Sequence, residues 1–277
     1  MPKNSVRAGG VPVNPFIAFD AQHRSLTWEL SRRDVLGRYR GASAGMAWSL
    51  ISPLLMLGVY TLAFGYVLKS RWPGATGSTV DFALILFLGL LTHGLVAEVM
   101  TRSPMLIVGN SNLVKRIVFP LEVLPWTVVL ATLFHLCANI LVFVLLSALV
   151  RGTVPWTIVL LPLVLLPLVF LSVGLGWLLS SLGVYLRDIG QFMGVASTAL
   201  LFLSSAIVPV STLPANYQLL FHLNPLTFII DQVRNVAYWG VLPDWRGLAL
   251  YAAGSVLFSA LALTVFRKLR RGFADVL

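Results

Sequence analysis

The chain has 277 residues, of which 58% are hydrophobic and 11% charged, and its formal net charge is +10. A mean hydropathy of +0.88 and repeated long apolar runs exclude a soluble globular domain, in which about 25% of residues are charged. They predict an all-α integral membrane protein with several spans. The runs are continuous rather than alternating, unlike barrel strands. We attribute the positive charge to cytosolic loops rather than to nucleic-acid binding.

Residues 1–25 form a predicted cytosolic N-terminal tail, because their prolines and glycines interrupt any apolar core of a signal peptide. Residues 26–40 have helical spacing, and Trp28, Val35, Leu36 and Tyr39 fall on one side. This pattern predicts an amphipathic interface helix on the inner leaflet. An ordinary solvated charged helix is the alternative.

Six spans follow in the predicted transmembrane domain, which covers residues 26–277. Their approximate limits are 44–68, 80–100, 122–150, 154–186, 190–210 and 247–266. The fourth run would be about 50 Å long as one helix, against a hydrocarbon core of about 30 Å, so it could also form two short spans. Gly37, Gly41 and Gly45 precede the first span at every fourth position, a spacing that permits close helix packing, a kink or a cap.

The 211–246 segment is neither a long span nor a polar loop. Pro214 and Pro225 are predicted first residues of two short helices, and Asn224 is a candidate cap of the second. In that second helix, Asp231 and Arg234 are placed on the polar side. We expect a re-entrant hairpin at the outer face, with a surface helical loop as the alternative.

The distribution of positive charge orients the spans. With the N-terminus inside, the cytosolic segments hold 15 of the 20 lysines and arginines, and the outer segments hold five. Cytosolic loops are enriched in these residues. The bias predicts six crossings with both termini in the cytosol, and one crossing for the fourth run.

Polar residues inside the spans are few. Glu98 and Arg102 stand four apart and are expected to pair, either as a gate or relay or as a surface pair near the interface. His135 and Asn139 share a helix face, where they line a pathway or bond across helices.

The segment 112–125, NLVKRIVFPLEVLP, lies between two long apolar runs. It is basic at Lys115 and Arg116 and contains Pro120 and Pro125. We interpret it as a stiff cytosolic elbow that receives a mechanical push from a partner protein.

Motifs for catalysis are absent from the sequence. No glycine-rich phosphate loop is present, no HExxH or CxxC motif indicates a metal site, and the four histidines lack ligand spacing. Glu98 is the only acid of the first five spans away from their ends, which disfavours ion coupling. A transport subunit driven by a partner is the remaining interpretation.

The chain resembles the membrane subunits of ABC-2 exporters, specifically the bacterial permeases for O-antigen, capsule and teichoic acid. The residues that carry the resemblance are Arg38-Tyr39-Arg40 with Ser43, Gly45, Trp48 and Pro53; Leu113 to Arg116 with Phe119-Pro120 and Leu124-Pro125; and Asn224-Pro225-Leu226 with Arg234. The first two groups look closest to O-antigen permeases.

The resemblance implies a bacterial inner-membrane complex of two permease chains and two copies of a separate ATPase, which binds the ATP and Mg²⁺. This chain would bind no cofactor. The resemblance places the coupling helix within about 103–121 and the outer hairpin at 214–239. The implied cargo is a polyprenyl-pyrophosphate-linked glycan that moves from the cytosolic leaflet through a channel between the permeases.

Four groups of candidate site residues follow. The coupling elbow is Lys115, Arg116, Phe119 and Pro120; the arginines that could meet the lipid phosphate are Arg32, Arg33, Arg38 and Arg40; the candidate channel aromatics are Trp48, Tyr60, Phe64, Phe192 and Phe202; and the outer hairpin contributes Asn224, Pro225, Asp231 and Arg234. The arginines could instead attract anionic lipid generally, and the aromatics could be ordinary core or lipid-facing residues.

Two other classes of protein stay open. One is a membrane-embedded enzyme acting on lipid-linked sugars, which the missing paired acids and metal ligands disfavour. The other is an ABC-2 permease for a drug or small lipid.

Overall fold

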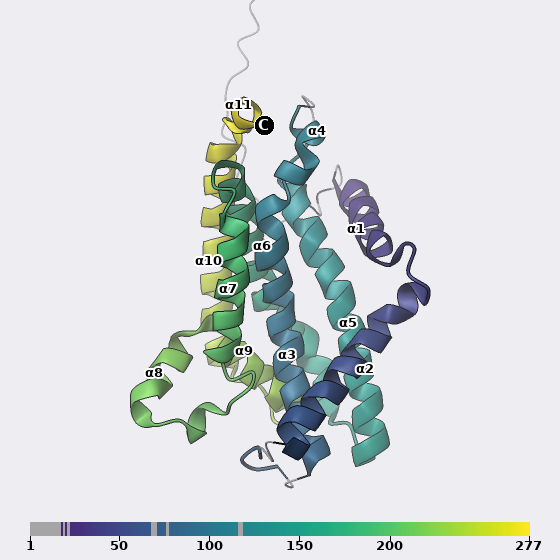
Figure 1. The fold of residues 1–277 in the computed structure, drawn as a ribbon. Coiled ribbons are helices and arrows are strands. Elements are labelled where there is room, and N and C mark those ends of the chain that lie inside the picture. Colours follow the sequence, from purple (N-terminus) through teal and green to yellow (C-terminus); the bar gives the residue numbers. More distant parts are fainter. Residues whose placement is uncertain (1–17, 19, 21–22, 68–70, 76–77, 116–118) are drawn as a thin grey trace, which may run out of the picture.

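The computed structural model describes residues 18, 20, 23–67, 71–75, 78–115 and 119–277. Within this part of the chain the structure is helical and contains no β-strand (Figure 1). Five helical runs of the described residues are long and apolar enough to cross a membrane: Gly45–Val67, Thr79–Met105, Val123–Arg151, Trp156–Tyr185 and Trp245–Arg270. They correspond to five of the six predicted spans.

The first run joins η2 (Gly45–Ala47), α2 (Trp48–Tyr60) and the π-helical η3 (Thr61–Val67). The second joins α3 (Thr79–Arg102) and η4 (Ser103–Met105), and α5 (Val123–Arg151) is the third. The fourth joins η6 (Trp156–Leu160) and α6 (Leu161–Tyr185). The 154–186 segment, which could have formed two short spans, therefore forms one helical run. The last is α10 (Trp245–Arg270), followed by α11 (Phe273–Val276).

The fifth predicted span is shorter than expected. The helix α7 (Ile189–Phe202) has 14 residues, about 21 Å at 1.5 Å per residue, whereas the prediction reached residue 210. The chain stays apolar beyond Phe202, but the Ser204 hydroxyl accepts a hydrogen bond from the Ala206 amide at 3.2 Å. A local side-chain bond of this kind competes with helix continuation.

The helix α1 (Arg24–Tyr39) packs beside α5 (Figure 1). Its buried residues are Thr27, Ser31 and Val35. Trp28 lies on the same side of the helix as Val35, two turns earlier, but it is 68% exposed. Small side chains cover the inward face because the two helices approach closely there.

The turn between α1 and α2 explains two of the spaced glycines. Gly41 has φ +84° and Gly45 has φ +50°, a left-handed region that glycine adopts without a steric penalty. No atom lies within 4 Å of the Cβ position of either residue. These glycines reverse the chain rather than pack two helices.

The short helices divide between the two ends of the bundle. At the α1 end lie η5 (Val108–Asn110), α4 (Ser111–Val114) and α11, and at the opposite end lie α8 (Ala215–Leu223) and α9 (Pro225–Arg234) (Figure 1). The connecting turns there are η7 (Val210–Thr212) and the π-helical η8 (Asn235–Trp239). α6 packs along α10, and α3 contacts α5, α6, α7 and α9, which makes α3 the central helix.

Candidate functional site

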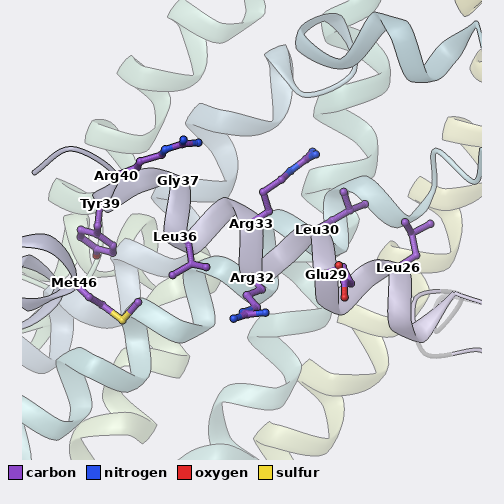
Figure 2. Close-up of a pocket in the computed structure, with 10 residues that line it drawn as sticks. All are labelled: Leu26, Glu29, Leu30, Arg32, Arg33, Leu36, Gly37, Tyr39, Arg40 and Met46. Carbon is purple, nitrogen blue, oxygen red and sulfur yellow. The ribbon is translucent and has the colours of Figure 1, made fainter.

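Arginines of α1 border a surface pocket of about 810 Å³ (Figure 2). Arg32, Arg33 and Arg40 line it, together with Glu29, Leu36 and Met46. Figure 2 shows Arg33 and Arg40 extending from one side of α1 and Arg32 from the other. The three guanidinium groups therefore do not converge on one point but spread over the exposed surface of the helix.

The fourth predicted arginine, Arg38, lies elsewhere. It bonds to the Glu98 carboxylate on α3, with Nη1 donating to Oε2 at 3.4 Å and Nη2 bonding to Oε1. The expected pair of Glu98 and Arg102 is confirmed, with Arg102 Nη1 donating to Oε1 at 2.9 Å. Arg102 Nη2 also donates to both oxygens of Asp34 at 2.6 and 2.7 Å. Four charged groups thus join α1 to the end of α3.

A second polar contact fastens α1 to α5. The Tyr39 hydroxyl lies 3.0 Å from His135 Nδ1. Burial raises the pKa of Tyr39, so the hydroxyl stays protonated at neutral pH and shares a hydrogen bond with the imidazole. His135 has the predicted helix-to-helix role and also borders a groove, which it shares with Asn139.

This groove lies between α2, α3 and α5 and has a volume of about 730 Å³. We call it the inner groove. Of the five predicted channel aromatics, Trp48 and Tyr60 line it. Phe64 lies beside Tyr60, with ring centroids 6.2 Å apart, but does not border the groove. Phe192 and Phe202 are exposed on α7, at 65% and 60%, and lie outside the groove.

Polar residues of the inner groove escaped the sequence analysis. Ser49, Ser52 and His93 line it, and His93 Nε2 lies 3.0 Å from the carbonyl oxygen of Ser197 on α7. The sequence did contain a pattern that could have indicated the α2 wall of this groove. Four of its residues recur at every fourth position and so share one face of α2: Trp48, Ser52, Met56 and Tyr60. The groove therefore combines aromatic rings with hydroxyl, imidazole and amide groups.

The elbow connects α4 to α5 at the α1 end of the bundle. Lys115 is exposed and Arg116 lies outside the described residues, so the structure places only part of the predicted basic pair. Phe119 and Pro120 are half-buried. The carbonyl oxygen of Phe119 accepts a hydrogen bond from Arg270 Nη2 at 3.0 Å.

The end of the elbow is held by buried Glu122. Its carboxylate accepts two hydrogen bonds from Arg270 Nη1, at 2.8 and 2.7 Å, and Arg267 Nε lies 3.8 Å away. Its backbone carbonyl accepts from the Trp177 indole at 2.9 Å. The elbow is thus attached to both α10 and α6, a role of Glu122 that the sequence did not indicate.

At the opposite end, Asn224 and Pro225 begin α9 as expected. The Asn224 side chain accepts a hydrogen bond from the Leu226 amide at 2.9 Å, and Pro225 is the first helical residue. Pro214 precedes α8 as its cap rather than as its first residue, which corrects that prediction.

The placement of Arg234 on the polar side of α9 is wrong, since its side chain is only 2% exposed. Its three nitrogens donate to the carbonyl oxygens of Ile85, Ser205 and Ala206, at 3.1, 2.5 and 2.8 Å. Gly89 permits this arrangement, because a Cβ there would lie 2.5 Å from Arg234 Nη2. Asp231, also predicted to be polar, is 45% exposed and lies 3.7 Å from Arg234.

A bundle of five helical runs that are long and apolar enough to cross a bilayer is the architecture of a multi-pass membrane protein. The chain belongs to the ABC-2 type transporter family, whose sequence profile matches residues 25–238. Members of this family are transport subunits.

Relatives with curated names extend the comparison over nearly the whole chain. The O-antigen export system permease RfbA of Myxococcus xanthus is 27% identical over 92% of this chain and 96% of its own length. RfbA of Klebsiella pneumoniae is 25% identical over 90% of this chain and 93% of its own length. The polysialic acid transport protein KpsM of Escherichia coli is 22% identical over 85% of this chain and 90% of its own length. The resemblance to O-antigen permeases is confirmed.

Proposed function

We propose that the chain is the permease subunit of an ATP-driven exporter that moves a polyprenyl-pyrophosphate-linked, O-antigen-like polysaccharide. The movement runs from the cytosolic to the outer face of the bacterial inner membrane. The single observation that carries the proposal is the inner groove, in which Trp48 and Tyr60 stand beside Ser49, Ser52 and Asn139. Aromatic faces pack against the C–H groups of sugars, and the polar groups match sugar hydroxyls.

In this proposal the chain crosses the membrane six times. The five long helical runs are joined by α7, which makes the fifth crossing together with the apolar segment 203–210, and α8 and α9 form the re-entrant hairpin at the outer face. α1 lies on the inner leaflet, where the exposed Trp28 and Leu36 enter the lipid while the arginines meet the headgroups. Both termini are then cytosolic, as the charge bias predicts.

Two copies of the chain enclose the glycan path, with the inner groove of each copy facing the other. The lipid pyrophosphate meets Arg32, Arg33 and Arg40, because guanidinium groups pair bidentately with phosphate oxygens. Arg38 is engaged with Glu98 and instead positions α1. General attraction of these arginines to anionic lipid, about 1 kcal/mol per residue, is the competing explanation.

Energy enters through two copies of a partner ATPase, which bind ATP and Mg²⁺. Nucleotide binding displaces the elbow at Lys115, Arg116, Phe119 and Pro120, and the bonds of Phe119 and Glu122 to Arg270 pass the displacement to α10. The elbow can act as a lever because its second end is attached to α10 through Arg270 and to α6 through Trp177.

A capsule-type polysaccharide is the second candidate cargo, since one relative, KpsM, is named a polysialic acid transport protein. Teichoic acid or a small lipid or drug would be carried by the same class of subunit. A membrane-embedded enzyme acting on lipid-linked sugars is the candidate from another class.

The test is reconstitution of the chain in proteoliposomes with the ATPase encoded by the neighbouring reading frame. The rate of ATP turnover is then measured with and without polyprenyl-pyrophosphate-linked glycans. We expect the lipid-linked glycan to stimulate ATP turnover. Combined Trp48→Leu and Tyr60→Leu should abolish most of the stimulation while basal turnover is kept. The matched control is Phe192→Leu with Phe202→Leu, which changes two exposed rings outside the groove. Equal loss in both double variants, or stimulation by a drug but not by any glycan, would contradict the proposal.

A further inference from the structure

A second concave site is lined by residues of η7, α8, α9, η8 and the loop that contains Trp72. The helices α8 and α9 lie at the end of the bundle opposite α1 (Figure 1). We call it the outer pocket. Its volume of about 400 Å³ falls within the range of about 300–1,000 Å³ that is typical of ligand sites. Nothing in the proposed mechanism so far uses this pocket.

The floor of the outer pocket is rigid. The Trp72 ring is 9% exposed, and the Arg234 guanidinium carbon lies 4.2 Å from its centroid. Arg234 is fixed by its three bonds to backbone carbonyls. Because those donors are already engaged, Arg234 shapes the floor but presents few free donors to an anion.

The rim of the outer pocket supplies the polar groups. Gln218 Nε2 donates to the carbonyl oxygen of Leu213 at 2.8 Å, which orients the amide and leaves its oxygen to accept. The half-exposed Asp231 carboxylate and the Asn235 amide border the same space. These groups together present both hydrogen-bond donors and acceptors to one pocket.

One wall of the pocket is aromatic. Trp239 lines it and is held in place by Tyr238, with ring centroids 4.7 Å apart and the rings nearly perpendicular. A fixed indole presents a flat face with negative electrostatic potential. The partially positive C–H groups on the face of a pyranose ring complement that potential.

We propose that the outer pocket binds a neutral sugar residue, with the pyranose face on Trp239 and its hydroxyls bonded to Asp231, Gln218 and Asn235. An acidic sugar would meet the Asp231 carboxylate, whereas the Arg234 guanidinium is already paired with Asp231 at 3.7 Å and donates to three backbone carbonyls. This inference rests on the proposed function and deepens it: a sugar that leaves the membrane path is held at the outer face, which opposes its return.

The experiment uses the full-length chain in lipid nanodiscs without the ATPase, and saturation-transfer NMR with methyl glycosides of glucose, galactose, mannose and rhamnose. Methyl glucuronide serves as the acidic probe. We expect at least one neutral glycoside to bind. Asp231→Asn should weaken its binding by about tenfold, which is the scale of losing one hydrogen bond to a charged group. Trp239→Leu should weaken it by a factor of about ten or less, because the aromatic face is lost. The matched control is Tyr217→Leu, which changes an exposed α8 residue outside the pocket.

Absence of binding for every neutral probe, or binding that Asp231→Asn and Trp239→Leu leave unchanged, would overturn the outer site. Binding lost in Trp48→Leu but kept in both pocket variants would assign the sugar to the inner groove and would also overturn it. Stronger binding of methyl glucuronide than of the neutral probes would refute the stated specificity. Each of these results leaves glycan export testable in proteoliposomes, so failure of the pocket is distinguishable from failure of the proposed function.

Discussion

Two arginine clusters hold the two ends of this molecule in different ways. At the α1 joint, which comprises Asp34, Arg38, Glu98 and Arg102, the side chains are 19–36% exposed. At the α9 joint, Arg234 is 2% exposed and all its bonding partners are backbone carbonyls or the Asp231 carboxylate. Ion pairs that water can reach contribute about 0–1 kcal/mol, whereas removal of one partner from a buried charged cluster costs about 3–5 kcal/mol. We therefore expect the α1 joint to be the weaker attachment and the α9 joint the stronger one.

The largest expected effect is at the α9 joint. Arg234→Met leaves three carbonyl groups without their donor, so we expect the free energy of unfolding to fall by about 3–5 kcal/mol. Arg234→Lys should keep only part of the stability that Arg234→Met loses, since an ammonium group lacks the planar set of N–H donors of a guanidinium. Unfolding in mixed detergent measures the change. Asp231→Asn is the control, with a change below about 1 kcal/mol; an equal loss there would contradict the assigned role of the backbone carbonyls.

An intermediate effect is expected at the elbow, where a buried carboxylate meets a half-exposed arginine. Glu122→Gln and Arg270→Gln should each lower the free energy of unfolding by about 1–3 kcal/mol and reduce glycan-stimulated ATP turnover. The exchange Glu122→Arg with Arg270→Glu tests the pair directly, because restored turnover requires the bond and not only the residues. If each single variant couples ATP turnover normally, Glu122 is a structural residue only.

The smallest effect is expected at the α1 joint. Glu98→Gln and Arg38→Gln should each change the free energy of unfolding by at most about 1 kcal/mol, and the difference from the unmodified chain should shrink in high salt. Measured at low salt and at about 1 M salt, where the Debye length is about 3 Å, the two variants should converge on the unmodified chain. A loss as large as that of Arg234→Met would remove the distinction between the two joints.

Much of the architecture follows from local chemistry. Five of the long helices correspond to apolar runs that are visible in the sequence, because a stretch of about 20 apolar residues has few other stable states. The beginning of α9 at Asn224-Pro225 and the Glu98–Arg102 pair were also predictable, since a cap and an i, i+4 pair depend on neighbours in the sequence. In each case the partners lie within one turn of helix.

The candidate site was less predictable. The sequence placed five aromatic residues near a channel, but only Trp48 and Tyr60 line the inner groove. It also grouped Arg38 with Arg32, Arg33 and Arg40, although Arg38 turns toward Glu98, 60 positions away. Composition identifies which side chains could serve a glycan path, but the rotation of each helix decides which of them face it.

The sequence by itself determined that this chain is a helical membrane protein with a basic elbow and that it lacks the usual motif for ATP binding, because hydrophobic run length and motif spacing are local properties. Only the tertiary structure decided that Arg234 is buried and that Glu122 anchors the elbow to Arg270. Each of these depends on a contact between distant segments: the Arg234 guanidinium meets the Ile85 carbonyl across 149 positions. Such contacts follow from how the helices pack.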